Sequence, residues 1–241
     1  MRPIAIVPAY DAAPLIGDVV DQLMQLCPDA WGPGSVLVID DGSNDDTAAI
    51  ARAAGADVLV HHHNMGKGAA LRTGMRAAWQ RGFDVAITID GDGQHPPDEA
   101  LRMHACHHDA AALVIGVRDL VGAGAPRPNQ LSNSFSNRVL SAFTGAELLD
   151  TQCGLRRYPI AATLALGGHE DGYGYEAEIL MRAIAAGIAI EHESIRVLYP
   201  PNRISHFDAV RDPTKIVARV VRTALETRLG SLRKVIGLRS R

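Results

Sequence analysis

The stretch from Ser35 to Val60, SVLVIDDGSNDDTAAIARAAGADVLV, indicates how this chain folds. It begins with an apolar run at 35–39, passes through acidic and small polar residues into a helix-forming run that ends near Ala53, and closes with a short apolar run at 58–60. A strand, a helix and another strand in this order form a βαβ unit, the building block of a mostly parallel sheet. The sequence therefore predicts an α/β fold.

The same alternation continues on both sides of this unit. We expect further strands at 4–7, 85–89, 112–117 and 188–197, and helices at 14–26, 68–80, after 97, at 129–143 and at 175–186. The rhythm changes after a Gly- and Pro-rich loop at 122–128, but no Pro/Ser-rich linker, low-complexity tract or repeat separates the two halves. The second half is thus predicted to be built onto the sheet rather than to form a separate domain.

Length and charge exclude some classes of protein. A chain of 241 residues is long enough for one α/β domain with a short extension. Its 24 Lys and Arg residues nearly balance 27 Asp and Glu residues, which gives a formal net charge of -3. A dedicated nucleic-acid binder would normally be basic, so no nucleic-acid partner is expected.

The cysteines and the hydropathy pattern bear on the cellular setting. Cys27, Cys106 and Cys153 lie far apart with no CxxC spacing, which favours a reduced, cytoplasmic setting. The first apolar run is too short for a signal-peptide core, and no stretch approaches the roughly 18 apolar residues of a membrane span. We therefore expect no segment integral to a membrane.

Two aspartates follow directly on the expected strand at 85–89, in the stretch DGDGQHPP at 90–97. Asp90 and Asp92 would present hard oxygen ligands at the carboxyl edge of the sheet, where α/β proteins bind their ligands. A divalent cation such as Mg²⁺ suits this pair, with Gln94 as a further oxygen ligand and the remaining oxygens supplied by a group such as a diphosphate. The alternative is a polar turn in which Asp and Gly are present for backbone reasons.

A second acidic cluster follows the strand at 35–39. Asp40 and Asp41 could bind a nucleobase or ribose hydroxyls, whereas Ser43, Asn44 and Asp45 are more typical of a helix N-terminus.

A lysine stands between two glycines in GKGAALRTG at 66–74. Lys67 is thus expected at the start of a helix, where it can contact a phosphate or order the acidic loop. The spacing is not that of a P-loop, and no GxGxxG follows the first strand. A P-loop NTPase and a Rossmann dehydrogenase are both disfavoured.

Six motifs, taken in order, resemble those of family 2 glycosyltransferases, in particular the dolichol-phosphate mannosyltransferase and polyprenyl-phosphate glycosyltransferase branch. They are Val7-Pro8-Ala9-Tyr10, DDGSNDDT at 40–47, GKGAALRTG at 66–74, DGDGQHPP at 90–97, DTQCGLRRY at 150–158 and YGYEAEI at 173–179. The resemblance covers roughly residues 3 to 206, which is most of the chain.

This resemblance implies a GT-A fold, which we assign to residues 1–210, a UDP- or GDP-linked sugar donor, Mg²⁺ or Mn²⁺, and inversion at the anomeric carbon. Carried over by position, Pro8 and Tyr10 would flank the nucleobase. The further donor-binding residues would be Asp40, Asp41, Lys67 and Asp90. The metal and the diphosphate would be held by Asp90, Asp92 and Gln94, so that Asp92 also counts as catalytic.

Two kinds of acceptor remain open. A lipid phosphate is already anionic near neutral pH, so arginines would position it and no general base is needed; Arg118, Arg127 and Arg203 are the candidates. A hydroxyl acceptor would need a carboxylate base, and Glu176 or Glu178 would supply it. The helix that carries these two glutamates could equally serve packing, with Tyr173, Ile179 and Leu180 in the core and the acids on a solvated face.

The sequence departs from the family pattern at two places. Ala12 stands where the branch usually has Glu in the first loop, so the identity of the donor is not inherited. His206 stands where a lysine is expected, and it would contact the acceptor phosphate only when protonated or donating a hydrogen bond.

The last segment, 211–241, is basic. It has nine Arg and Lys residues against two acids, a net charge of +7, with apolar residues at helical spacing between them. Such a segment either lies on an anionic membrane or forms a solvated face, and we favour the membrane, at the inner face as a peripheral contact. The histidines at 61–63, together with His104, His107 and His108, are expected at the surface.

These observations predict a cytoplasmic, peripherally membrane-associated and metal-dependent inverting glycosyltransferase. It would move a sugar from a UDP or GDP donor to a polyprenyl phosphate or related lipid. One alternative is transfer to a hydroxyl of a glycolipid or polyene-type lipid. Another is a non-catalytic nucleotide-sugar-binding protein that keeps the fold.

Overall fold

The computed structural model of the protein describes residues 1–106 and 109–199. Seven strands form one sheet. They are β1 (Pro3–Ala9), β2 (Val36–Asp40), β3 (Asp57–Val60), β4 (Val85–Thr88), β5 (Leu113–Arg118), β6 (Arg156–Pro159) and β7 (Ile190–Ile195). The helices are α1 (Ala13–Trp31), α2 (Thr47–Ala53), α3 (Lys67–Gln80), α4 (Asp98–Ala105), α5 (Arg127–Thr144), α6 (Ile160–Ala165) and α7 (Gly174–Ala185).

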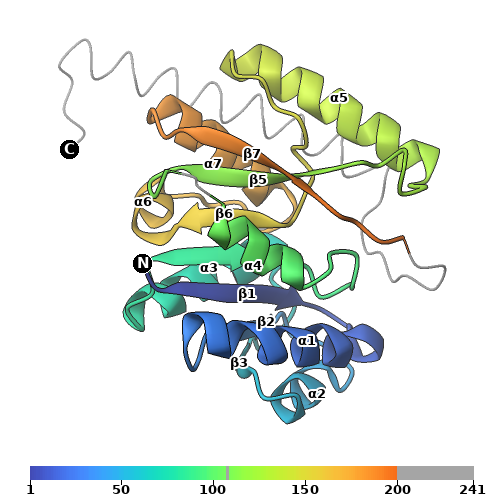
Figure 1. Cartoon of the computed structure of the whole chain (residues 1–241), viewed down its shortest axis with the longest axis vertical. Helices are drawn as coiled ribbons and strands as arrows, with labels where there is room; N and C mark the ends of the chain where they lie inside the picture. Colours follow the sequence, from blue (N-terminus) through green and yellow to red (C-terminus); the bar gives the residue numbers. More distant parts are fainter. Residues whose placement is uncertain (107–108, 200–241) are drawn as a thin grey trace.

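The sheet has the strand order β3-β2-β1-β4-β6-β5-β7 (Figure 1). All neighbouring strands run parallel except β6, which is antiparallel to both β4 and β5. The sheet is thus mostly parallel and the α/β prediction is confirmed. Strands β6 and β7, which follow the loop at 122–128, join the same sheet as the strands before it.

The strand order reverses between β1 and β4, and this reversal positions the site. From β1 the chain moves outward through β2 to β3, and it then returns through α3 to β4 on the other side of β1. Right-handed crossovers therefore place α3 on the opposite face of the sheet from α1 and α2. Helix α1 packs against α2 and α4, whereas α3 packs against α6 and α7. The crevice beyond the carboxyl ends of β1 and β4 is where such sheets bind ligands.

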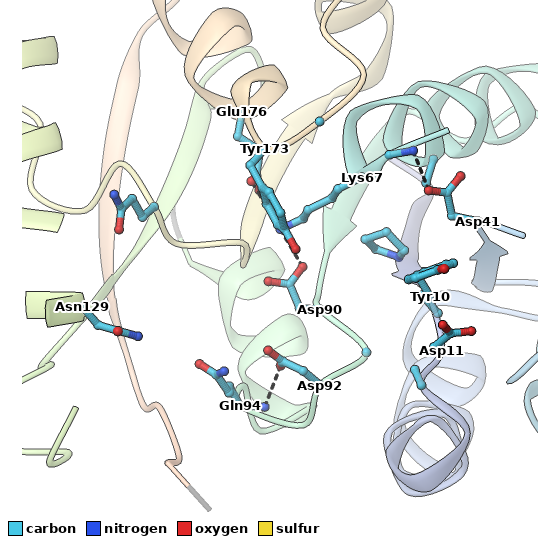
Figure 2. A pocket seen from close by; sticks show the side chains of 18 of the residues that line it. Tyr10, Asp11, Asp41, Lys67, Asp90, Asp92, Gln94, Asn129, Tyr173 and Glu176 are labelled. Carbon is cyan, nitrogen blue, oxygen red and sulfur yellow. Dashed lines mark hydrogen bonds and ion pairs between the residues drawn. The ribbon is translucent and has the colours of Figure 1, made fainter. Parts of the chain in front are cut away.

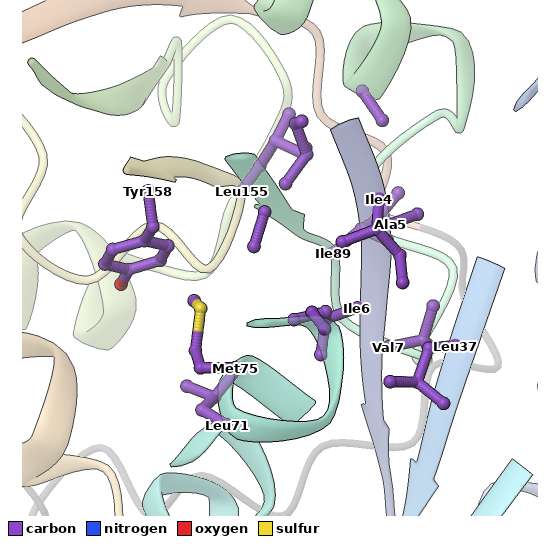
Figure 3. Packing of buried hydrophobic residues seen from close by; sticks show 14 of the residues in the cluster. Ile4, Ala5, Ile6, Val7, Leu37, Leu71, Met75, Ile89, Leu155 and Tyr158 are labelled. Carbon is purple, nitrogen blue, oxygen red and sulfur yellow. The ribbon is translucent and has the colours of Figure 1, made fainter. Parts of the chain in front are cut away.

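The core lies between the central strands and these helices. Every residue of β1, β2 and β4 is buried, because both faces of these strands are covered. Figure 3 shows Ile6 of β1 with Leu71 and Met75, which lie one turn apart on α3, and Tyr158 of β6 in the same cluster. This packing fixes the strand ends that carry the acidic loops.

Strand β6 and helix α6 were not predicted from the sequence. The strand reads RRYP and has no apolar alternation, yet Arg156 is fully buried and Arg157 nearly so. The Arg156 guanidinium donates to the backbone carbonyls of Cys153, Thr151 and Glu176. Because these bonds satisfy the buried charge, the strand can occupy the middle of the sheet without an apolar pattern.

Other elements differ from expectation at their ends. Strand β1 continues through Pro8 to Ala9. The Ala5 N–H donates to Ser35 on the β2 side, so three positions later the Pro8 nitrogen faces β4 instead. Pairing with β4 ends at Ile6, and the missing proline N–H therefore removes no ladder bond. Helix α1 runs on to Trp31, and α5 begins at Arg127, inside the expected loop, with Pro128 in its first turn.

Among the helices of residues 1–106 and 109–199, none is both long and apolar enough to cross a bilayer. The boundary at 210 and the basic segment 211–241 lie outside the described residues, so they remain sequence-based expectations.

Candidate active site

A cavity of about 380 Å³ lies at the carboxyl edge of the sheet. The loops after β1, β2, β4 and β5 line it, together with the first turns of α3 and α7 and one side of α5. Figure 2 shows the labelled side chains that converge there. They are Tyr10, Asp11, Asp41, Lys67, Asp90, Asp92, Gln94, Asn129, Tyr173 and Glu176.

The acid pair lies in this cavity, one residue beyond buried Ile89. The Asp92 carboxylate accepts the Gln94 N–H at 3.0 Å, and the Gln94 carbonyl accepts the Leu198 N–H at 2.7 Å, so Gln94 is tied both to Asp92 and to the segment after β7. Gly154 packs closely on Asp90, where a Cβ would lie 2.2 Å from Oδ2. The glycine of the DTQCG stretch is thereby explained by the space that Asp90 occupies.

The two carboxylates have different electrostatic surroundings. Burial, and then the nearby charge of Asp90, raise the pKa of Asp92 to about 6. Burial is the largest single influence on Asp90 and would raise its pKa, but the charge and hydrogen bond of Lys67, together with the nearby His95 and Arg118, hold that pKa below its ordinary value. Because the charge of Asp90 disfavours the ionised form of Asp92, the pair favours a bound cation, whose positive charge would lower the cost of ionising Asp92.

Lys67 links three parts of the cavity. Its Nζ lies 2.7 Å from Asp90 Oδ1 and 3.3 Å from Glu176 Oε2, joining the start of α3 to the β4 loop and to α7. Burial would lower the pKa of Lys67, but the charges of Asp90 and Glu176 raise it above its ordinary value. Glu176 is 6% exposed, and its Oε1 has no hydrogen-bond partner among the described residues. A polar atom in this position is ready for a ligand.

The donor atoms present fit a divalent cation that arrives with a phosphate ligand. Asp90, Asp92 and Gln94 offer carboxylate and amide oxygens, the ligand type that Mg²⁺ and Mn²⁺ prefer. Within residues 1–106 and 109–199, no group of three His, Cys, Asp or Glu side chains is arranged to hold a metal. The remaining oxygens would therefore come from a diphosphate and water, as is usual for Mg²⁺ sites.

Asp41 lines the opposite end of the cavity from Gln94 and is held by three bonds. Its Oδ1 accepts the Met65 N–H at 3.0 Å and lies 2.6 Å from His61 Nδ1, and its Oδ2 accepts the Gly66 N–H at 2.6 Å. The second ring nitrogen of His61 lies 2.9 Å from Thr73 Oγ1. The surface placement expected for His61 is therefore wrong, because Asp41 and Thr73 hold its ring in a half-buried position; His62 and His63 are exposed as expected.

Asp40 does not line the cavity, contrary to expectation. Its carboxylate accepts both the N–H and the hydroxyl of Ser43, so it closes the turn after β2. Of the two aspartates expected to bind the donor, only Asp41 therefore lines the cavity. The polar residues that follow also fasten loops: Ser43 Oγ accepts the Asp11 N–H, and the Asn44 N–H donates to the Asp11 carboxylate.

These bonds hold the loop after β1, which carries Pro8 and Tyr10. Both residues line the cavity, and Figure 2 shows Tyr10 on the side of Asp41. The sequence-based placement of the two beside a donor is thus compatible with the geometry.

Helix α2 begins without a side-chain cap, although Asp45 accepts the Thr47 N–H.

Glu178 does not line the cavity, contrary to expectation. Its carboxylate accepts the N–H groups of His169 and Glu170, each at 2.9 Å, and pairs with Arg182 at 2.8 Å. It lies outside the cavity lining and anchors the loop before α7. Only Glu176 faces the cavity, because the two positions point to different sides of the helix.

The arginines predicted to bind an acceptor are separated by the structure. Arg118 lines the cavity and forms a bidentate pair with buried Asp150, with Nε at 2.8 Å and Nη2 at 2.9 Å. Its Nη1 has no acceptor among the described residues. Arg127 is exposed at the start of α5 and does not line the cavity, so the structure gives it no place in the site. Arg203 and His206 lie outside the described residues.

Sequence reasoning missed several residues of the cavity. Tyr173, expected in the core, lines it instead, whereas Ile179 and Leu180 are buried as expected. Asn129, Ser136, Thr151 and Gln152 also line it, a set of uncharged polar groups on the side of Arg118. The DTQ stretch at 150–152 is a sequence signal for Thr151 and Gln152, whereas Asn129 and Ser136 lie on α5 outside it.

Comparison with known proteins decides the family. The model of Glycosyl transferase family 2 matches residues 4–162, about two thirds of the chain. The chain belongs to glycosyl transferase family 2. The resemblance drawn from the six motifs is thereby confirmed, and this protein is a glycosyltransferase.

Two relatives of this family 2 glycosyltransferase have named activities. The UDP-N-acetylglucosamine--dolichyl-phosphate N-acetylglucosaminyltransferase of Methanococcus voltae is 28% identical, and the match covers 80% of this chain and 84% of that protein. The polyprenol monophosphomannose synthase of Mycolicibacterium smegmatis is 29% identical, over 78% of this chain and 74% of that protein. Both names fall in the polyprenyl-phosphate branch that the motifs resemble.

A solved structure shows the same fold. Glucosyl-3-phosphoglycerate synthase from Mycobacterium tuberculosis, crystallised with Mn²⁺, UDP and phosphoglyceric acid, superposes with a TM-score of 0.72 at 20% identity. The match covers 94% of this chain and 78% of that one. The same enzyme has also been crystallised with Mg²⁺ and UDP. The expected GT-A fold is confirmed.

Proposed function

We propose that this family 2 glycosyltransferase is metal-dependent and moves a sugar from a UDP- or GDP-linked donor to a polyprenyl phosphate, with inversion at the anomeric carbon. The observation that carries the proposal is one cavity that holds Asp41, the pair Asp90 and Asp92, and Arg118. The names of the two relatives, a dolichyl-phosphate N-acetylglucosaminyltransferase and a polyprenol monophosphomannose synthase, support the lipid acceptor.

The nucleoside part of the donor would bind between Tyr10 and Asp41. An ionised carboxylate only accepts hydrogen bonds, so Asp41 would accept an N–H of the base or a ribose hydroxyl. Its bonds to His61 and to the Met65 and Gly66 amides fix its orientation before the donor arrives. A preorganised acceptor loses less entropy on binding.

The diphosphate would lie near Lys67, Asp90 and Asp92. Asp90, Asp92 and Gln94 would hold Mg²⁺ or Mn²⁺, which supplies positive charge for the departing nucleoside diphosphate. Lys67 adds a second positive charge at the start of α3, where the helix dipole also favours an anion.

The acceptor phosphate would lie at the other side of the cavity, near Arg118. The Nη1 group of Arg118 can donate to a phosphate oxygen while Asp150 holds the other side of the guanidinium. A phosphate oxygen is an anion near neutral pH, so no residue has to remove a proton from it. Arg203 and His206 remain proposed as further phosphate contacts.

One observation favours a second candidate, transfer to a hydroxyl. Glu176 Oε1 is buried beside the cavity and has no partner among the described residues. In this position it could accept the proton of an acceptor hydroxyl as a general base. Glu176→Gln tests it: a hydroxyl-transferring enzyme would lose about 10²–10⁴ in turnover, while a phosphate-transferring enzyme would lose much less.

The proposed function is tested by assaying UDP- and GDP-linked hexoses with a polyprenyl phosphate, with Mn²⁺ and with EDTA. We expect the product, a sugar linked to the polyprenyl phosphate, to form only with metal. The Asp92→Asn variant should stay folded but no longer form it. If no donor is transferred or hydrolysed by the folded wild type, the chain is instead a non-catalytic nucleotide-sugar-binding protein.

The setting of the reaction follows from the acceptor. A polyprenyl phosphate is held in a membrane, so the enzyme would act as a peripheral protein at its inner, cytoplasmic face. The basic segment 211–241 stays the proposed electrostatic contact, on the basis of its sequence alone.

A further inference from the structure

Helix α5 has two unlike faces. Its inner face carries Ser132, Asn133, Ser136 and Leu140, which are buried, and the helix packs against α7. Asn129 and Ser136 reach the cavity from this side. One helix therefore forms both a wall of the active site and, as Figure 1 shows, an outer edge of the molecule.

The outer face of α5 carries large apolar side chains. Leu131 is 71% exposed and Phe135 is 52% exposed, and they lie one turn apart. Phe143, at the end of the helix, is 42% exposed. An exposed pair of this kind on one helix marks a contact surface, whereas single exposed apolar residues are normal.

Arginines extend the same stripe. Arg127 precedes Leu131 by four residues and Arg138 follows Phe135 by three, so all four side chains share one side of the helix, and both arginines are exposed. No Asp or Glu occurs between Arg127 and Thr144. We call Arg127, Leu131, Phe135 and Arg138 the outer stripe.

The charge of the outer stripe selects its partner. A second copy would bring the same arginines against each other, since a two-fold contact pairs identical surfaces. The segment 211–241 of this chain has a net charge of +7 and is equally unfavourable. An anionic lipid surface complements both features, because phosphates pair with the arginines and the acyl boundary accepts Leu and Phe.

We propose that the outer stripe of α5 is a membrane-contact surface, with Leu131 and Phe135 inserted at the headgroup boundary and Arg127 and Arg138 on lipid phosphates. This inference deepens the proposed function, on which it rests for the lipid acceptor. The stripe and the cavity wall are two sides of one helix, so membrane contact here holds the active site within one helix diameter of the leaflet.

The test compares two double variants of the full chain in flotation with phosphatidylglycerol-containing vesicles. Leu131→Ser/Phe135→Ser is expected to weaken vesicle binding about tenfold or more, because two large apolar groups no longer leave water. Val60→Ser/Trp79→Ser removes similarly exposed apolar side chains from β3 and α3, and should change binding by less than about twofold. Equal binding of both variants and the wild type overturns the proposal.

Two further measurements separate the alternatives. Brominated lipid should quench the tryptophan fluorescence of the Phe135→Trp variant more than that of the wild type. Equal quenching of the two proteins would contradict insertion. Sedimentation without lipid should give the same mass for wild type and Leu131→Ser/Phe135→Ser; an oligomer that this variant dissociates would assign the stripe to a second copy.

Turnover distinguishes this inference from the proposed function. On a water-soluble short-chain prenyl phosphate, Leu131→Ser/Phe135→Ser should match the wild type, and on vesicle-held polyprenyl phosphate it should be slower. A wild type that transfers to neither acceptor contradicts the proposed function, while vesicle flotation still decides the surface.

Discussion

Lys67 is the residue on which the charge balance of the cavity depends. Its ammonium contacts both Asp90 and Glu176, and Asp90 is one of the residues that would hold the metal. The lysine and a metal therefore compete for Asp90 until a diphosphate supplies further negative charge.

Lys67→Met should accordingly have opposite effects on two ligands. Mn²⁺ alone is expected to bind several-fold more tightly, because Asp90 loses its competitor, while UDP or GDP with Mn²⁺ should bind about tenfold more weakly. Titration of free Mn²⁺ by electron paramagnetic resonance measures both. Arg81→Met, which removes a surface pair with Asp57, is the control and should change neither.

Asp41 and His61 form the second pair at this scale. His61→Ala removes the 2.6 Å partner of Asp41 Oδ1 and leaves the carboxylate held only by the Met65 and Gly66 amides, so its orientation should be less firmly fixed. We expect KM for the donor to rise about five- to tenfold with kcat nearly unchanged, and His61→Gln to recover part of the loss. The exposed neighbour His62→Ala serves as control. A fall in kcat alone would show that His61 does not act through donor binding.

At the scale of elements, most of the sheet could be predicted from the sequence, and β6 could not. Strands such as Val36–Asp40 and Val85–Thr88 are buried, mainly apolar runs that contain or precede acids at their carboxyl ends, and this pattern needs no tertiary information. Strand β6 depends on Arg156 finding three carbonyls from distant segments, which a local pattern does not contain.

The site shows the same division. Loops that follow buried strands placed Asp41, Asp90 and Asp92 correctly at the cavity, because strand ends share one edge of the sheet. The sequence does not show which of two neighbouring acids faces the cavity. The Asp40 carboxylate binds Ser43 instead, and the Glu178 carboxylate binds the loop at 169–170. Those choices depend on backbone N–H groups that only the folded chain brings near.

Helix α7 gives a prediction that separates its two glutamates. Glu178→Gln should lower the free energy of unfolding by about 1–3 kcal/mol, since it weakens charge-assisted bonds to two amides and to Arg182. Glu176→Gln should cost less, because Oε1 has no partner in the described part of the chain. Urea denaturation of both variants measures this order, and the reverse order would contradict the roles assigned here.

At the scale of the whole molecule, the acid pair should make the stability of the metal-free protein depend on pH. The pKa of Asp92 is about 6 in the folded protein, above its ordinary value of 3.8, so its favourable contribution is present below pH 3.8 and is lost as the pH rises through 6. Asp92→Asn removes this loss. In EDTA the variant should be more stable than the wild type by about 1–2 kcal/mol at pH 8 and nearly equal at pH 4.

Melting temperatures across this pH range check the prediction. If the difference in melting temperature between Asp92→Asn and the wild type is the same at every pH, the fold does not disfavour the ionised form of Asp92. The same melting curves show whether both proteins are folded without metal, which the ligand measurement requires.

The central claim is that Asp90 and Asp92 hold a cation which in turn binds a nucleoside diphosphate. Thermal unfolding with UDP or GDP, with and without Mn²⁺, tests it most directly. At a nucleotide concentration of about 100 times Kd, we predict stabilisation of roughly 2.7 kcal/mol, a rise in Tm of about 5–10 °C, that requires Mn²⁺ and is absent in Asp92→Asn. An equal rise without the metal, an equal rise in the variant, or no rise with either nucleotide would contradict the claim.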